Sequence, residues 1–123
     1  MKRAKLQGMS VEELIERFTA IALAQDKAIL MDEIAKFNRL FGQLEDVESE
    51  LKSREGDQRS ALLALYDHPN VQVRLTAAKA TLAVAPEQAR QELRRIAESR
   101  EYPQAGDAGM SLWNLERGIF KPT

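Results

Sequence analysis

Residues 61–82 constrain the fold of this chain more than any other stretch, because they contain a break between two apolar segments of helical character. The run reads ALLALYDHPNVQVRLTAAKATL. Pro69 lacks a backbone donor and disfavours helical geometry in the residue before it, and Asn70 is a favoured helix N-cap. The pattern predicts one helix that ends near Asp67, a tight turn, and a second helix that begins after Asn70.

The N-terminal half of the chain shows the same helical period. Ser10 and Glu13 have the spacing of a capping box, which predicts a first helix from there to about residue 25. A second helix is predicted from about residue 26 to Gly56, with Gly42 as a point of kinking or division.

The C-terminal half supplies the remaining helices. Asp57 is positioned to cap a third helix and Asn70 a fourth. Pro86 suits the first turn of a fifth, and a sixth follows Pro103 and closes at Gly118. No segment alternates as a strand does. The sequence therefore predicts an all-α fold of three antiparallel helix pairs, in one domain spanning residues 1–123 with residues 1–9 flexible.

The break region resembles a HEAT-like repeat, the antiparallel helix pair that stacks into α-solenoids. The resemblance implies an α-α superhelix of about three helix pairs, in which an Asp and an Arg tie the pairs together. Over a longer stretch, LYDHPNVQVRLTAAKATLAVAPEQAR followed by QAGDAGMSLWNLERG is similar to a small bacterial HEAT-like domain family of unknown function. The residues that carry the repeat pattern are Asp67, Val73, Arg74, Ala77, Ala78 and Leu82.

Arg74 lies between two apolar stripes of the fourth helix, because successive residues advance by about 100°. One stripe contains Val71 and Leu75, and the other begins at Val73. A guanidinium directed into packing needs a carboxylate, since leaving it unpaired costs about 3–5 kcal/mol. We expect Asp67, or a carboxylate of a neighbouring pair, to be that partner. A ligand-binding role for Arg74 is the alternative.

Polar side chains follow one side of each second-of-pair helix. In α-solenoids these helices line the concave surface, so the resemblance implies a single mixed-charge groove. The alternative is three separate, solvated helix faces. The candidate partner-binding residues are Asp32, Lys36 and Arg39 on the second helix, Gln72, Thr76 and Lys79 on the fourth, and Asp107, Ser111 and Asn114 on the sixth.

Trp113, the single tryptophan, is a further candidate. Gly106 and Gly109 share its helix, and a glycine inside a helix costs roughly 1 kcal/mol relative to alanine. Two such glycines beside an indole indicate close packing, so we expect Trp113 to pack within the last pair under Phe120 and Pro122. The alternative is an exposed aromatic anchor for a partner, because tryptophan is enriched at binding hot spots.

The side chains that most enzyme classes need are scarce. The chain has no cysteine and one histidine, His68, which excludes a thiolate nucleophile and a histidine–cysteine pair and leaves no second histidine for a metal. The run from Gly106 to Gly109 matches neither the Walker nor the dinucleotide pattern. We therefore expect no catalytic residues, no metal and no cofactor, and a protein that is not an enzyme.

Charge and hydropathy limit the partners and the compartment. Eighteen Lys and Arg residues nearly balance nineteen Asp and Glu residues, so there is no bulk attraction to nucleic acid. No apolar run has the length of a signal-peptide core or a membrane span, which predicts a cytoplasmic protein without a membrane partner. The oligomeric state is left open.

Two hypotheses of function follow. The first is a non-catalytic protein-interaction module, of the inhibitor or immunity type, that holds another protein in the mixed-charge groove. The second rests on a resemblance to HEAT-like DNA-repair proteins, which hold duplex DNA against a basic concave surface. Its support is a group of basic residues on the fifth helix, diluted by acidic ones. These are Arg90, Arg94 and Arg95 against Glu87, Glu92 and Glu98, and Lys36, Arg39 and Lys79 on other helices add to the basic set.

Overall fold

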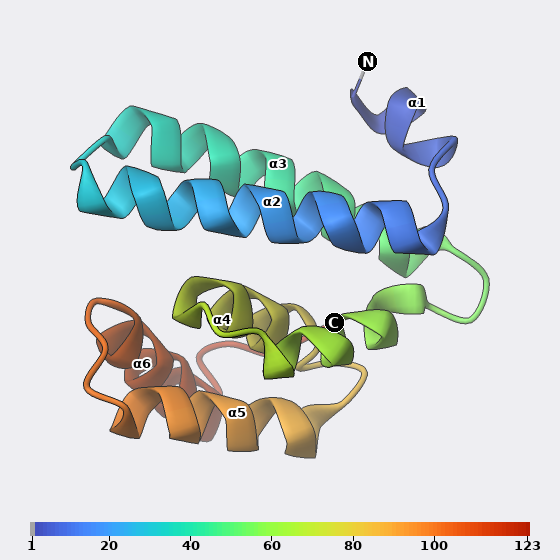
Figure 1. The fold of residues 1–123 in the computed structure, drawn as a ribbon. Coiled ribbons are helices and arrows are strands. Elements are labelled where there is room, and N and C mark those ends of the chain that lie inside the picture. Colours follow the sequence, from blue (N-terminus) through green and yellow to red (C-terminus); the bar gives the residue numbers. More distant parts are fainter. Residues whose placement is uncertain (1) are drawn as a thin grey trace. The chain divides into compact units, whose positions relative to one another are not determined.

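The computed structural model describes residues 2–123, with side chains described from residue 5 onward, and within that range it contains helices and no strands. The all-α prediction is therefore confirmed for the described residues, whereas the HEAT-like superhelix stays a prediction. Two compact units are present, residues 1–61 and residues 62–123. In chain order the elements are α1 (Lys2–Gln7), α2 (Val11–Leu30), α3 (Ile34–Ser53), η1 (Gln58–Asp67), α4 (Val71–Ala80), α5 (Pro86–Glu98) and α6 (Gln104–Glu116) (Figure 1).

The first unit is built on the α2–α3 helical hairpin (Figure 1). The predicted capping box begins α2: the Ser10 amide donates to Glu13 Oε1 at 2.9 Å, and the Glu13 amide donates to Ser10 Oγ at 3.1 Å. Each side chain thus satisfies a backbone donor that the first turn leaves unpaired. Large apolar side chains of both helices are fully buried in this unit, among them Leu14, Phe18, Val47 and Leu51.

The predicted boundary between the first two helices is wrong. Asp26 lies inside α2, which continues to Leu30, and the turn occupies residues 31–33. Helical geometry continues because Ala28 extends the buried face of Ile21 and Gln25 beyond residue 25. Asp32 then adopts a left-handed φ of 55°, a conformation that cannot propagate a right-handed helix. Gly42 does not divide the second helix, since α3 runs through it without interruption.

The N-terminal segment that the sequence predicts as flexible includes α1. Leu6 is buried, with 2% of its surface exposed. The Arg54 Nη2 atom, at the end of α3, donates to the carbonyl oxygens of Leu6 at 3.1 Å and Met9 at 2.8 Å. Glu50 accepts from Arg54 Nε at 2.7 Å, which holds the guanidinium in place. One arginine therefore joins the residues before α2 to the end of the hairpin.

The predicted third helix is a 3-10 helix, η1, preceded by Asp57. The Asp57 carboxylate accepts hydrogen bonds from the Arg59 Nε at 2.9 Å and Nη2 at 2.7 Å, and its Oδ1 also accepts the Arg59 amide at 3.3 Å. The Arg59 guanidinium holds the pKa of the Asp57 carboxyl below its usual value, because it stabilises the charged form. The carboxylate in turn raises the pKa of Arg59.

The second unit contains α4, the α5–α6 hairpin and the end of η1 (Figure 1). The Tyr66 hydroxyl and Thr81 Oγ1 lie 2.6 Å apart and share a hydrogen bond, and burial raises the pKa of Tyr66. The apolar stripe predicted for the fourth helix is confirmed as part of the core. That core contains Val71, Leu75, Ala78, Leu82, Ala89, Leu93, Ile96, Ala108 and Leu115.

Candidate functional site

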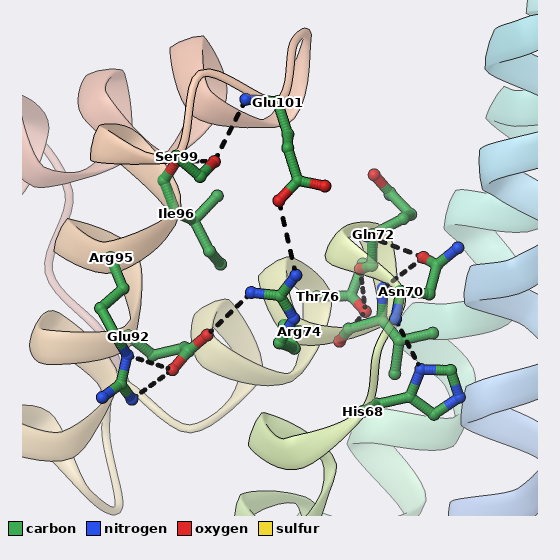
Figure 2. Close-up of polar contacts among 11 residues, drawn as sticks. His68, Asn70, Gln72, Arg74, Thr76, Glu92, Arg95, Ile96, Ser99 and Glu101 are labelled. Carbon is green, nitrogen blue, oxygen red and sulfur yellow. Dashed lines mark hydrogen bonds and ion pairs between the residues drawn. The ribbon is translucent and has the colours of Figure 1, made fainter.

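Arg74 pairs with two carboxylates of the second unit (Figure 2). Its Nη1 lies 3.7 Å from Glu92 Oε2, and its Nη2 lies 3.6 Å from Glu101 Oε2. The Arg74 side chain is 20% exposed, whereas that of Glu92 is 2% exposed. The guanidinium therefore joins α4 to α5 and to the loop that precedes α6.

Asp67, one of the two partners predicted for Arg74, does not pair with it. Asp67 is exposed at the end of η1, in line with the exposed Ala64. A 3-10 helix has three residues per turn, so these two share one side of η1, while Leu62, on another side, is fully buried. The alternative expectation, a carboxylate from the neighbouring helix pair, describes the observed pairing.

Glu92 is a central residue that sequence reasoning treated only as a surface charge. Its Oε1 accepts hydrogen bonds from the Arg95 Nε, at 3.0 Å, and from the Arg95 Nη2, while its Oε2 faces Arg74. Glu92 follows the buried Ala89 by three residues and precedes the buried Ile96 by four. That spacing assigns it to the buried face of α5, and it is the signal that could have identified it.

Asn70 caps α4, as predicted. Its Oδ1 accepts from the amides of Gln72 at 2.8 Å and Val73 at 3.2 Å. The Asn70 amide donates to His68 Nδ1 at 3.0 Å, so the histidine acts as an acceptor inside the turn (Figure 2). The geometry gives both residues a structural role at the start of α4.

Two of the predicted partner-binding residues on α4 are buried. Gln72 is 4% exposed and Thr76 is 8% exposed, so the expectation that they lie on an open polar surface is wrong. Of the ten residues of α4, only Arg74 and Lys79 are not buried. A helix buried around almost its whole circumference must bury polar residues too, and these are hydrogen-bonded.

Their hydrogen bonds follow that rule. The Thr76 hydroxyl donates to the Gln72 and Val73 carbonyls, at 3.0 Å each. Gln72 Oε1 accepts from Gln104 Nε2 at 3.0 Å, which links α4 to the first turn of α6. Gln72 and Thr76 therefore stabilise the second unit from inside.

The polar stripes of α4 and α6 do meet at the surface. Lys79 Nζ lies 2.9 Å from Asp107 Oδ1, with both side chains more than two-fifths exposed, and Ser111 Oγ lies 3.4 Å from the same oxygen. The backbone carbonyl of Asn114 accepts hydrogen bonds from the backbone amides of Ile119 at 2.9 Å and Phe120 at 3.3 Å. This part of the predicted surface is thus reduced to Lys79, Asp107, Ser111 and the half-buried Asn114.

The remaining predicted residues belong to the first unit. Asp32 lies in the α2–α3 turn rather than on the second helix, and it is exposed. Lys36 and Arg39 lie on α3, half-buried and exposed respectively. A continuous groove that joins these residues to the stripes of α4 and α6 stays a prediction.

Trp113 is 47% exposed, and Phe120 is 51% exposed. The Cζ atom of Arg117 lies 4.9 Å from the centroid of the indole ring, within the range of a cation–π contact. Trp113 is therefore exposed rather than closely packed under Phe120 and Pro122, and its role as an anchor for a partner stays a prediction.

The close packing expected around the two glycines of α6 is also absent among the described residues. A Cβ added at Gly109 would meet nothing within 4 Å, and one at Gly106 would meet only Tyr102 Cδ1 at 3.9 Å, an ordinary contact. These glycines thus destabilise α6 by about 1 kcal/mol each, and no close packing among the described residues offsets that cost.

The exposed tryptophan and the two glycines lie on one side of α6. We call it the α6 face, made of Gly106, Gly109, Met110, Trp113 and Arg117. The residues are spaced by three or four and so share one side of the helix. Met110 is 59% exposed, and further exposed apolar side chains lie just beyond both ends of the helix. These are Tyr102, Ile119 and Phe120.

Within the described residues, no helix is long and apolar enough to cross a membrane, and no cluster of three His, Cys, Asp or Glu side chains is arranged to hold a metal ion. The described residues thus form two helical units, and the second unit carries an exposed tryptophan on α6.

The chain belongs to the DUF2019 family, described as a domain of unknown function, whose model matches residues 12–116. It is similar to the protein RPA1889 from Rhodopseudomonas palustris CGA009, known from a crystal structure. The two are 52% identical and superpose with a TM-score of 0.94, over 96% of this chain and 98% of that one. No curated protein matches the chain.

Proposed function

We propose that this chain is a non-catalytic protein-interaction module and that the α6 face is its binding surface. The observation that carries the proposal is the exposed Trp113 with the guanidinium of Arg117 over its ring. Tryptophan and arginine are the residues most enriched at interface hot spots, where a large side chain enters a pocket of the partner. The cation–π contact favours a defined indole orientation before binding, which lowers the entropy cost of association.

The surroundings of Trp113 match the anatomy of an interface. Met110 lies one turn away and supplies an adaptable apolar contact. Polar residues follow the adjacent flank of α6, where the Lys79–Asp107 ion pair and Ser111 lie. A central apolar group with a polar rim is the usual arrangement of protein–protein interfaces. Lys79, Asp107, Ser111 and Asn114 thus keep a role as rim residues, whereas the buried Gln72 and Thr76 do not contact a partner.

A second group of exposed apolar side chains lies at the α2–α3 turn, where Leu30 is 78% exposed, Met31 64% and Ile34 69%. This group has no aromatic or arginine anchor at the tip of the turn. The α6 face is the better candidate because it combines Trp113 with Arg117.

The alternative hypothesis of DNA binding has less support. Arg95 on α5 is paired with the buried Glu92, and Arg74 lies between Glu92 and Glu101. Guanidinium groups held by carboxylates are poor phosphate ligands. A protein partner, including one that this chain would inhibit or neutralise, fits the mixed surface better than a polyanion does.

The proposal is tested by affinity capture from a lysate of the native host, with quantitative mass spectrometry. Trp113→Ala should lose the proteins that the wild type retains. Phe41→Ala is the matched control, since Phe41 on α3 is 49% exposed and Trp113 is 47% exposed. It should retain them. Equal recovery with both variants would place the binding surface outside the α6 face.

A further inference from the structure

The α6 face carries a protruding side chain and an unfilled surface on the same side of one helix. Trp113 is the protruding side chain. Gly109 and Gly106 precede it by four and seven residues, which places them about 6 Å and about 10 Å along the helix axis. Both are open: an added Cβ at Gly109 would meet nothing, and one at Gly106 only the edge of Tyr102. Bare backbone at these positions lets a bulky group from outside approach the helix closely.

A protruding side chain and bare backbone on the same side of one helix make that side complementary to itself. In an antiparallel pair related by a two-fold axis, the Trp113 of each copy lies against the Gly106 and Gly109 positions of the other. This is the condition for an isologous interface, in which one patch is used by both subunits. One side of one helix thus supplies both halves of the contact.

The ends of α6 agree with the same arrangement. Antiparallel pairing places the N-terminal end of α6 in one copy beside the C-terminal end of α6 in the other. Apolar side chains also lie beyond each end: Tyr102 is 71% exposed before α6, and Ile119 is 64% exposed after it. Pairing the ends crosswise brings these groups to the same edges of the interface.

We infer that two copies of this chain pair through antiparallel α6 helices, with each Trp113 seated on the glycines of the other copy. The inference rests on the proposed function, because it uses the same face, and it names the partner as a second copy. It also explains why a helix that needs no glycine for its own packing has two beside its tryptophan.

The test combines sedimentation velocity with tryptophan fluorescence on the full chain. Trp113 is the single tryptophan, so its emission reports on this site alone. For the wild type we expect a monomer–dimer equilibrium and an emission maximum that moves to shorter wavelength as the concentration rises. Gly106→Ala combined with Gly109→Ala should weaken dimerisation by about tenfold or more, because the added methyl groups keep the indole of the other copy away from the helix backbone.

The double variant separates a lost interface from a lost fold. Alanine favours helix over glycine and has space here, so the double variant should unfold at a temperature no lower than that of the wild type at low concentration. Gly42→Ala is the matched control, because Gly42 lies inside α3 with nothing within 4 Å of an added Cβ. It should leave dimerisation and emission unchanged.

Three results would overturn the inference. They are a wild type that stays monomeric at all concentrations, a dimer whose formation leaves Trp113 emission unchanged, and a double variant that dimerises as the wild type does. If the wild type is monomeric and the Trp113→Ala variant still loses captured proteins, only the self-pairing is wrong. If the wild type dimerises and the Trp113→Ala variant keeps every captured protein, the proposed function is wrong for partners other than a second copy.

Discussion

At the scale of single residues, the charges around Glu92 decide how strongly Arg74 contributes to stability. The Glu92 side chain is only 2% exposed. When Arg74 is removed, Glu92 still accepts hydrogen bonds from Arg95, so one of its carboxylate oxygens stays paired. The Arg74 contacts of 3.6 and 3.7 Å are ion pairs rather than short hydrogen bonds. Arg74→Ala should therefore lower the free energy of unfolding by about 1–3 kcal/mol, less than the loss of a buried pair whose partner is fully orphaned. Urea denaturation measures this difference.

Arg94→Ala is the control for Arg74. Arg94 is exposed on the same helix as Glu92, and its removal should change the free energy of unfolding by no more than about 0.5 kcal/mol. Equal, small effects of the two substitutions would show that the Arg74 ion pairs contribute nothing to stability. A ligand-binding role for Arg74 would then be the better hypothesis.

At the scale of elements, α4 depends on its N-cap. This helix has only ten residues, and Asn70 Oδ1 accepts two of its first amides. Asn70→Ala should cost about 1 kcal/mol, the usual effect of removing a cap. Asn70→Asp should cost less, because it keeps the acceptor and adds a negative charge at a helix N-terminus. Thermal unfolding of both variants checks the order, and an alanine variant as stable as the aspartate one would contradict the capping role.

At the scale of the whole molecule, the charge balance predicts weak interaction with nucleic acid. The chain has eighteen basic and nineteen acidic residues, and Arg95 of the α5 group donates hydrogen bonds to Glu92. A gel-shift titration with random duplex DNA at low salt should therefore show no complex at concentrations typical of non-specific DNA-binding proteins. A salt-sensitive shift that Arg94→Ala reduces would favour the DNA-binding alternative instead.

The candidate site was predictable only in part, and single residues show why. Trp113 could be singled out because it is unique, yet its exposure depends on which side of α6 faces the core. Gln72 and Thr76 read as a polar stripe, but they are hydrogen-bonded inside the second unit. Periodicity distinguishes apolar from polar sides of a helix; it does not reveal that a short helix is buried on both.

The sequence by itself determined the helical class, the Ser10 and Asn70 caps and the apolar stripe of α4, because each depends on neighbours within one or two turns. Only the tertiary structure decided the partner of Arg74, the burial of Glu92 and the exposure of the α6 face. These depend on which helices pack together and at what rotation. Local hydrogen bonds and spacing are encoded within a few residues, whereas the pairing of charges from α4 and α5 arises only when distant segments meet.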